Sequence, residues 1–346
     1  MDRRDFLRST GGLAALATGC ASAAASSSDQ TNAPPGPERT YSFASPWVEH
    51  HAGLADDAHR LARRIEAASG NSLAFDFRSG VRGRADFTMR PVQSDVLLHP
   101  AFAVFGGLPG NDVLTPRELD AWLATGGGQE LWDDLAASHG FKPLLAGHTG
   151  PDPVLWSRSP ISRSADLAGQ RVVARGLDAE VVRALGAIPI IADDMELQAA
   201  LTDPDTTAVV WGSLIHASAS NIPAQFPHGH FGALGSAGGA LALEIDLTVW
   251  NDLTHAQQTA IAAVAHSEFR SSVADAEATR AAVTQAIAIR TGAVFTSPTL
   301  EFTAAVSRIA AAVVAHTAAY DAVAARIDRS YSSFRRAVRS PAVNIA

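Results

Sequence analysis

The sequence predicts an α/β fold built in two blocks, with long helices near the C-terminus. Helix and strand patterns alternate over residues 40–78 and again over 142–211, as they do in open α/β sheets. Two Ala-rich helical patterns follow, one from Thr254 to about Thr291 and one from about Leu300 to Ser332. No repeat occurs at the periods of roughly 20–50 residues that mark solenoids.

The first block begins with a β-leaning segment at 40–47. Apolar residues then recur at three- to four-residue steps from Leu54 to Ala68, which predicts a helix. Alternation over 73–78 predicts a strand, and 95–98 suggests another. Thr115-Pro-Arg-Glu118 has the cap, proline and acidic residue of a helix start, and a further helix is expected over 130–138.

The second block repeats this alternation. Strands are expected at 142–146, 154–156, 171–175, 188–191 and 207–211, and 241–249 is strand-like. A helix is expected from Asp178 to Leu185. Asp193-x-x-Glu196 has the spacing of a capping box, which predicts a helix through Leu201.

Residues 1–20 have the pattern of an export signal. Arg3 and Arg4 precede Phe6 and Leu7 at twin-arginine spacing, and a short apolar region ends in small residues before Cys20. This apolar region is shorter than the ~20 residues of a membrane-spanning helix. We expect export and a lipid on Cys20; the alternative is an ordinary cleaved signal with a cysteine nearby.

The composition after the signal limits the classes of partner. Residues 21–38 are mostly small residues and prolines, which predict a flexible tether. The net charge is −8, and it becomes −9 without residues 1–19, which contain three arginines and two aspartates. This charge argues against nucleic acid as a partner. Cys20 is the single cysteine, so no intramolecular disulfide is expected.

A collinear set of short motifs resembles one family. The set is Gly-Gly-Gly-Gln-Glu-Leu-Trp (126–132), Gly-His-Thr-Gly (147–150), Trp156, Asp-Leu-x-Gly (166–169), Gly-Leu-x-x-Glu-Val (176–181), Leu-Gly-Ala-Ile-Pro (185–189), Glu196-Leu-x-x-Ala-Leu and Trp-Asn-Asp-Leu (250–253). In this order it is similar to the extracytoplasmic solute-binding subunit of TRAP (tripartite ATP-independent periplasmic) transporters, especially the branch that binds 2-oxo acids and related monocarboxylates.

The resemblance implies a fold, an organisation and a function. The fold is α/β, two-lobed and periplasmic-binding-protein-like (type II-like), with lobe I at 39–149 plus about 235–280. Lobe II is expected at 150–234 plus about 281–340 with the long packing helices. The chain would act in the periplasm, capture a small organic solute between the lobes and deliver it to a membrane permease, without enzymatic chemistry. The alternative is a lipid-anchored descendant that lost solute binding and acts as a scaffold or sensor partner.

Arg175 is the expected carboxylate ligand. The family places an arginine four residues after the glycine of Asp-Leu-x-Gly, but Val173 stands there. Strand side chains alternate with period two, so Arg171, Val173 and Arg175 would share a face. A bidentate guanidinium suits a buried carboxylate. The alternative is that both arginines pair with acids on the surface.

Three further positions are candidate ligand contacts, namely Asp152, Trp156 and Trp211. In the family a glutamine that binds substrate and sodium would stand at Asp152, which instead suits a cation, an amine or a hydroxyl, or is a turn residue. The family's metal-binding carboxylate falls at Val210, so a sodium ion depends on other oxygens such as main-chain carbonyls. Trp211 is either an apolar cleft wall or plain core.

Other patterns carry less chemistry. The family's Trp and Glu before the last crossing strand fall near Leu234 and Ser236, within a Gly-rich stretch that either approaches a ligand closely or marks a vestigial site. His228-Gly-His230 lacks the partners of a zinc pattern, so no metal is expected. No serine has the spacing of a Gly-x-Ser-x-Gly elbow. A homodimer through the C-terminal helices is a further expectation.

Overall fold

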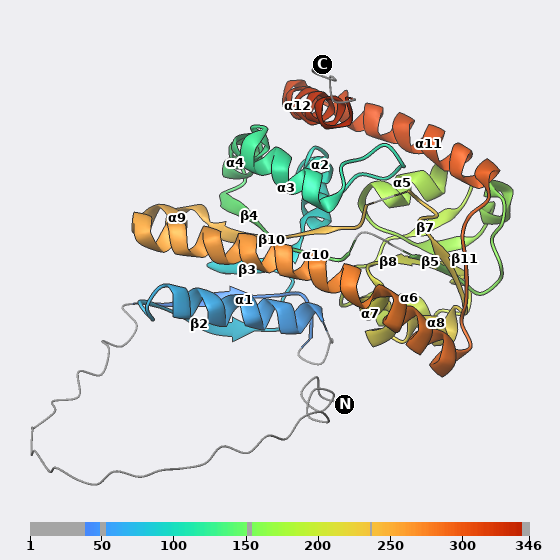
Figure 1. The fold of residues 1–346 in the computed structure, drawn as a ribbon, viewed down its shortest axis with the longest axis horizontal. Coiled ribbons are helices and arrows are strands. Elements are labelled where there is room, and N and C mark those ends of the chain that lie inside the picture. The colour runs from blue at the N-terminus through green and yellow to red at the C-terminus, as the bar shows by residue number, and fades with distance from the viewer. Residues whose placement is uncertain (1–38, 49–52, 151–153, 236, 341–346) are drawn as a thin grey trace, which may run out of the picture. The chain divides into compact units, whose positions relative to one another are not determined.

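Two separate β-sheets organise the chain (Figure 1). The structure is a computed structural model that describes residues 39–48, 53–150, 154–235 and 237–340. Residues 1–38, with the expected signal peptide, Cys20 and the expected tether, therefore lie outside the described residues. None of the described helices is both long enough and apolar enough to cross a membrane.

The first sheet has the strand order β2-β1-β3-β10-β4. Strand β1 is parallel to β2 and β3, whereas β10 is antiparallel to β3 and β4. Its strands and the elements around it are β1 (Arg39–Ala44), α1 (Leu54–Ala68), β2 (Leu73–Arg78), β3 (Phe87–Pro91), η1 (Val92–Leu97), α2 (Phe102–Gly106), α3 (Pro116–Thr125), α4 (Gly128–Ala137), β4 (Phe141–His148), β10 (Ala240–Asp246) and α9 (Leu247–Asp252).

The second sheet has the order β11-β9-β5-β8-β6-β7. Strands β8, β6 and β7 run parallel, and β5 is antiparallel to both β8 and β9. Its elements are β5 (Val154–Ser157), η2 (Ser164–Leu167), β6 (Arg171–Val173), α5 (Gly176–Ala184), β7 (Ile188–Ile190), α6 (Leu197–Thr202), β8 (Ala208–Trp211), α7 (Leu214–Ala219), α8 (Ile222–Gln225), β9 (His228–Phe231) and β11 (Val294–Thr296).

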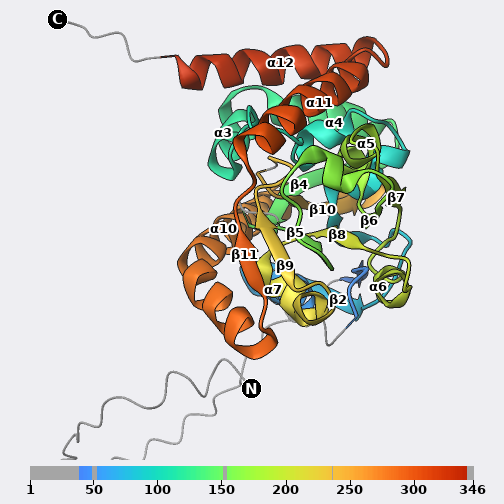
Figure 2. The same cartoon turned by 90° about the vertical axis from the view of Figure 1, so that its right-hand side faces the viewer.

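Three long helices complete the chain. Helix α10 (His255–Thr291) packs against β4 and α1 beside the first sheet and against α7 and α8 beside the second (Figure 1). Helix α11 (Leu300–Ala318) packs on α5, and α12 (Ala322–Arg339) packs on α3 and α4 (Figure 2). The predicted α/β architecture with long C-terminal helices is confirmed, whereas the lobe boundaries remain a prediction.

Two chain segments that connect the sheets lie against each other. The amide of Thr149 donates to the carbonyl of Gly239 at 2.9 Å, and the amide of Gly239 donates to Oγ1 of Thr149 at 2.9 Å. Gly238 has a φ of 89°, and a Cβ there would lie 1.9 Å from the carbonyl oxygen of Gly150. Glycine is therefore required for this close approach of two backbones.

Three sequence expectations are wrong in their boundaries. Residues 95–98 do not form a strand, because Asp95 is buried within η1, where its carboxylate binds arginines. Strand β10 ends at Asp246, whose side chain caps α9. The helix expected over 300–332 is two helices, since Asp321 accepts a hydrogen bond from the amide of Ala324 and starts α12.

Candidate functional site

A cavity of about 680 Å³ is lined by residues from both sheets. The first sheet contributes β3 and η1, and the second contributes the loops that follow β6, β7 and β8. Thr149, Gly238 and Gly239 from the connecting segments close one side. The wall is mostly apolar, with a few charged and amide side chains, as is common in pockets for small organic ligands.

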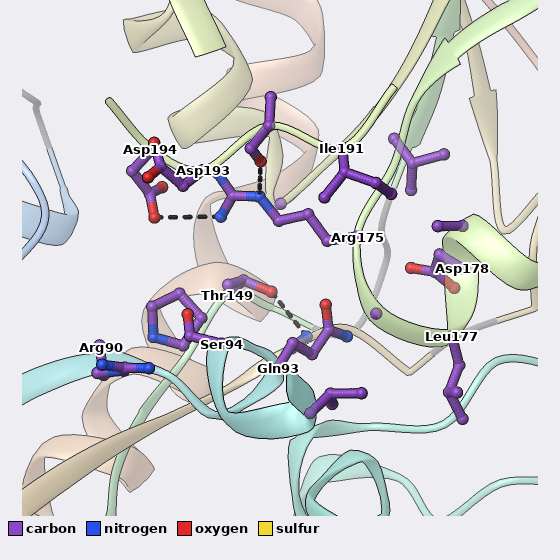
Figure 3. A pocket seen from close by; sticks show the side chains of 18 of the residues that line it. Arg90, Gln93, Ser94, Thr149, Arg175, Leu177, Asp178, Ile191, Asp193 and Asp194 are labelled. Atoms are coloured by element: carbon purple, nitrogen blue, oxygen red, sulfur yellow. Dashed lines mark hydrogen bonds and ion pairs between the residues drawn. The ribbon is translucent and has the colours of Figure 1, made fainter. Parts of the chain in front are cut away.

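Arg175 lies on this wall and is held on several sides (Figure 3). Its Nε donates to the carbonyl of Ala192 at 2.6 Å, and its Nη1 lies 3.1 Å from Oδ2 of Asp194. Its guanidinium carbon lies 4.0 Å from the centre of the Trp211 ring. Its Nη2 is buried and has no hydrogen-bond partner among the described residues. One donor of a fixed arginine at the cavity wall thus lacks a partner among the described residues.

The local fold brings Arg175 to the cavity for a different reason from the one the sequence suggested. Strand β6 ends at Val173, so strand alternation does not extend to Arg175. Arg175 is instead the extended residue directly before α5. Arg171 points elsewhere and pairs with Asp203 at 3.4 Å, and Val173 is fully buried.

Of the other predicted ligand contacts, one lines the cavity, one is buried in the core and one lies outside the described residues. Trp211 lines the cavity beside Arg175, and Val210 lines it too. Trp156 does not line the cavity, because it is 0 % exposed on β5 and packs edge-to-face on Phe295. Asp152 lies outside the described residues. The structure therefore brings Arg175 and Trp211 together and leaves Trp156 in the core.

Several polar residues of the cavity were missed from the sequence. Asp194 is one of them: its side chain is 7 % exposed and pairs with Arg175. Gln93 and Ser94 on η1 face Arg175 and Asp178 from the other lobe (Figure 3). The doublet Asp193-Asp194 was the available signal, since the capping box uses Asp193 and Glu196 and leaves Asp194 without a role.

Asp178 is the third residue of α5 and lies on the cavity wall. None of the described residues donates a hydrogen bond to its carboxylate or pairs with it. Burial raises the pKa of Asp178 to about 7. This carboxylate is therefore poorly compensated by the protein itself.

A buried ionic network underlies the cavity on the side of the first sheet. Nη2 of Arg90, on the wall, lies 3.0 Å from Oδ1 of Asp95, and Nε of Arg84 lies 2.7 Å from Oε2 of Glu244. Burial and the nearby Asp95 raise the pKa of Glu244 to about 8, against the effect of the arginines. Arg90 is thus already engaged by acids.

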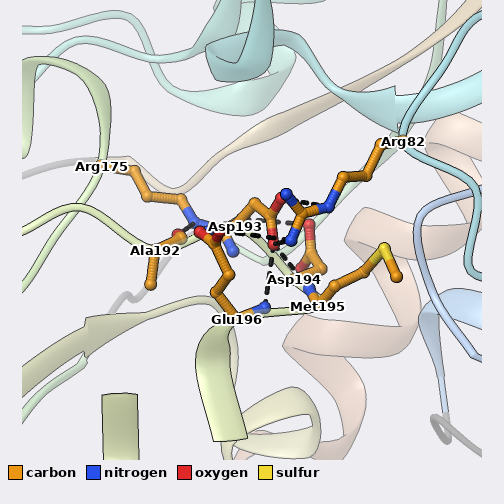
Figure 4. Close-up of polar contacts among 7 residues, drawn as sticks. All are labelled: Arg82, Arg175, Ala192, Asp193, Asp194, Met195 and Glu196. Atoms are coloured by element: carbon orange, nitrogen blue, oxygen red, sulfur yellow. Dashed lines mark hydrogen bonds and ion pairs between the residues drawn. The ribbon is translucent and has the colours of Figure 1, made fainter. Parts of the chain in front are cut away.

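An ion pair joins the two lobes at the edge of the cavity (Figure 4). Nε of Arg82, in the loop between β2 and β3, lies 3.1 Å from Oδ2 of Asp193, and its Nη2 lies 3.2 Å from Oε1 of Glu196. Asp193 also accepts hydrogen bonds from the amides of Met195 and Glu196. The segment 192–196 thus contacts Arg175 on one side and Arg82 on the other.

The histidines singled out in the sequence have structural partners. His230 is buried, and its ring nitrogens lie 3.0 Å from Oγ of Ser157 and 2.8 Å from Oγ1 of Thr296. His148 is buried, and its Nδ1 accepts a hydrogen bond from the amide of Gly150 at 3.0 Å. Among the described residues, no group of three or more His, Cys, Asp or Glu side chains is arranged to hold a metal ion.

The arrangement defines a class: a two-lobed α/β protein with a ligand cavity lined by both lobes. No family model matches the sequence. Solved structures share the fold. A TRAP transporter solute-binding protein from Bordetella bronchiseptica, described as a dimer with calcium and picolinate at its active site, is 18% identical with a TM-score of 0.80, over 88% of this chain and 93% of the other.

Two further solved structures give the same result. A TRAP periplasmic solute-binding protein from Pseudoalteromonas atlantica with bound sodium and pyruvate is 19% identical, with a TM-score of 0.79 over 87% of this chain and 94% of the other. One from Colwellia psychrerythraea with calcium and pyruvate is 19% identical, with a TM-score of 0.77 over 87% and 95%. This chain therefore has the fold of TRAP solute-binding proteins, as the sequence motifs predicted.

At one position of the wall, the carboxylate that the sequence resemblance implies for a cation is replaced by an apolar side chain. Val210, at the position expected to carry the carboxylate, lies on the cavity wall and offers no side-chain oxygen. The permanent cation of Arg175 lies beside the neighbouring Trp211 instead. Hard cations require several oxygen ligands, so a cation here would depend on other oxygens.

Proposed function

We propose that this chain is the extracytoplasmic solute-binding subunit of a TRAP-type transporter. It would capture a small organic solute that carries a carboxylate and deliver it to a membrane permease, without catalysing a reaction. The observation that carries the proposal is Arg175, whose buried Nη2 has no described partner on the wall of the cavity. A cavity with available polar groups favours retained binding over a scaffold role.

The mode of binding follows from the geometry of Arg175. Its Nη2 would donate to a ligand carboxylate, a charge-assisted hydrogen bond stronger than a neutral one. Asp194 and the Ala192 carbonyl fix the guanidinium in advance, and this reduces the ordering cost of binding. Trp211 and the apolar wall would contact the body of the solute. No metal ion is required.

A thermal-shift screen of organic acids, amino acids, amines and polyols tests this proposal. We expect at least one carboxylate to raise the Tm of the wild type, and Arg175→Ala to abolish that shift. Because Arg175→Ala leaves Asp194 without its ion-pair partner, the double variant with Asp194→Asn is measured beside it. Arg171→Ala, outside the cavity, is the matched control and should respond as wild type does. A wild type that no compound stabilises would contradict the proposal.

We also propose that the chain is exported through its twin-arginine signal and anchored by a lipid on Cys20. Residues 21–38 would then tether the lobes near a membrane and raise their local concentration there. Metabolic labelling with a fatty-acid analogue tests the anchor, and Cys20→Ser should abolish the label.

We also propose that the protein forms a homodimer through its C-terminal helices. Leu300 on α11 is 90 % exposed, compared with 44 % for Val338 on α12, and the buried apolar residues of α12 pack within the chain on α3 and α4. We therefore expect α11, more than α12, to contribute to a dimer. Light scattering on the purified protein and on Leu300→Asp measures this.

A further inference from the structure

The cavity between the two sheets is larger than a short organic acid requires. Its volume is about 680 Å³. An apolar cavity of about 150 Å³ is enough for benzene, which has as many non-hydrogen atoms as a three-carbon 2-oxo acid. By this measure the cavity has room for roughly four times that number of atoms. A solute that fills it is therefore larger than a short 2-oxo acid.

This volume does not result from separated lobes, because the lobes already touch on two sides of the cavity. A Cβ at Gly176, at the start of α5, would lie 3.6 Å from Cβ of Gln93 on η1. On another side, Nε of Arg82 lies 3.1 Å from Oδ2 of Asp193. The space is thus present with the lobes in contact, and a solute of matching size would occupy it.

Apolar side chains from both lobes form the buried part of the wall. Leu54 on α1 and Leu241 on β10 line the cavity from the first lobe and are 4 % and 0 % exposed. Val210 and Trp211 at the end of β8 line it from the second lobe. Water against such a wall gains few hydrogen bonds, whereas apolar groups of a solute gain by leaving water. The interior therefore favours an apolar solute body.

The apolar surface continues to the edge of the cavity. Leu97 at the end of η1 is 93 % exposed, and it lines the cavity from the first lobe. Ile191 and Met195, which follow β7, are 60 % and 46 % exposed and line it from the second lobe (Figure 3). Exposed apolar groups gathered around a cavity are typical of binding sites. A long apolar body would cover these side chains.

We propose that the solute is an organic acid with a large apolar body of about eight or more carbons. This rests on the proposed solute-binding function and narrows its substrate class. The body of the solute would lie against Val210 and Trp211 and would extend to Leu97 and Ile191 at the edge.

A short or polyhydroxylated acid fits this cavity less well. It would leave water against the apolar wall and would leave Leu97 exposed. Hydroxyl groups also need partners, and charged side chains of the wall are paired with one another, as Arg82 is with Asp193 and Arg183 is with Glu180. An apolar body needs no such partners.

Isothermal titration calorimetry with straight-chain monocarboxylates of three to ten carbons, below their micelle concentrations, tests the proposal. The shorter acids are measured by competition with octanoate. The variants are Leu97→Ala and Ile191→Ala, one from each lobe, and both are expected to fold because these side chains are exposed. Ile289→Ala is the matched control, since Ile289 on α10 is 78 % exposed and does not line the cavity.

We expect the affinity of the wild type to rise about threefold for each added methylene up to eight carbons. Each variant should weaken octanoate binding about fivefold and leave butanoate binding unchanged, whereas Ile289→Ala should bind both as the wild type does. Affinities that do not rise with chain length overturn the inference, as does octanoate binding that neither variant weakens or that all three variants weaken equally. Tight binding of short acids would then leave the proposed function standing. If short 2-oxo and hydroxy acids also fail to bind, both are overturned.

Discussion

His148 is a buried residue whose titration should limit stability in acid. Burial lowers its pKa to about 3, and its Nδ1 accepts the amide hydrogen of Gly150. The unfolded chain takes up this proton near the ordinary value of 6.5, so the stability contributed by neutral His148 is present above that pH and is lost as pH falls toward 3.

The first prediction follows from this loss of stability with falling pH. Between pH 6.5 and 5 the free energy of unfolding of the wild type should fall by about 2 kcal/mol more than that of His148→Asn, whose amide oxygen can replace Nδ1 as acceptor. Urea denaturation at both pH values measures this. An equal fall in the free energy of unfolding of both proteins would show that His148 does not cause the loss of stability in acid.

Asp178 should have the opposite dependence on pH. Its folded pKa of about 7 lies above its ordinary value of 3.8, so the unliganded protein loses stability as pH rises from about 4 through 7. The full shift corresponds to about 4 kcal/mol, and because the Asp178 side chain is partly exposed, screening by solvent reduces it. At pH 8, Asp178→Asn should therefore be more stable than the wild type by about 2 kcal/mol. Urea denaturation without ligand measures this, with Asp205→Asn, at an exposed aspartate away from the cavity, as control. A destabilised Asp178→Asn would indicate that the carboxylate has a partner in the protein.

Single residues of the site could be predicted only in part. Arg175 was selected from the sequence, but it reaches the cavity from the start of α5 rather than along a strand. Gln93 could not be selected, because its role depends on which lobes face one another, whereas Asp194 had a signal in the Asp193-Asp194 doublet. Trp156 shows the limit of motif order, since a matched tryptophan is core.

At the scale of elements, Tyr331 connects α12 to the segment before α3. Its hydroxyl oxygen accepts a hydrogen bond from the buried amide of Leu114 at 2.8 Å, and its ring packs edge-to-face on Trp122. Burial raises the pKa of Tyr331 to about 12, so the phenol stays neutral. The hydroxyl is thus the acceptor that satisfies this amide.

Tyr331→Phe should therefore destabilise the protein by about 1–3 kcal/mol, the cost of leaving a buried N–H without an acceptor. The matched control is Tyr320→Phe, because Tyr320 is 65 % exposed and should be neutral. Chemical denaturation of both variants gives the comparison. Equal stabilities would mean that water replaces the hydroxyl.

Elements that depend on local signals were predicted well, and those that depend on distant pairing were not. Thr115 and Thr254 accept the hydrogen bonds that their capping boxes predict. Strand β9 was missed, since His228–Phe231 becomes a strand only through pairing with β5 and β11. The break before α12 was missed because the composition from α11 to α12 stays typical of a helix, and a single aspartate, Asp321, marks the start of α12.

At the scale of the whole molecule, the segment 192–196 links the site to the relative position of the lobes. It contacts Arg175 through Ala192 and Asp194, and it contacts Arg82 of the other lobe through Asp193 and Glu196 (Figure 4). In the proposed function a solute leaves when the lobes separate. That movement must break the pair made by Arg82, whereas the contacts of Arg175 stay within one lobe.

Arg82→Ala should therefore speed solute release with little effect on the contacts to the solute. Exposed ion pairs are each worth about 0.2–1 kcal/mol, and Arg82 contacts two acids, so we expect release to be about threefold faster. High salt should speed release in the wild type and have less effect in the variant. Arg78→Ala, which removes an exposed pair with Asp76 inside one lobe, should release solute at the wild-type rate. Stopped-flow dissociation, followed by tryptophan fluorescence, measures all three, and identical rates would mean that the pair does not hold the lobes together.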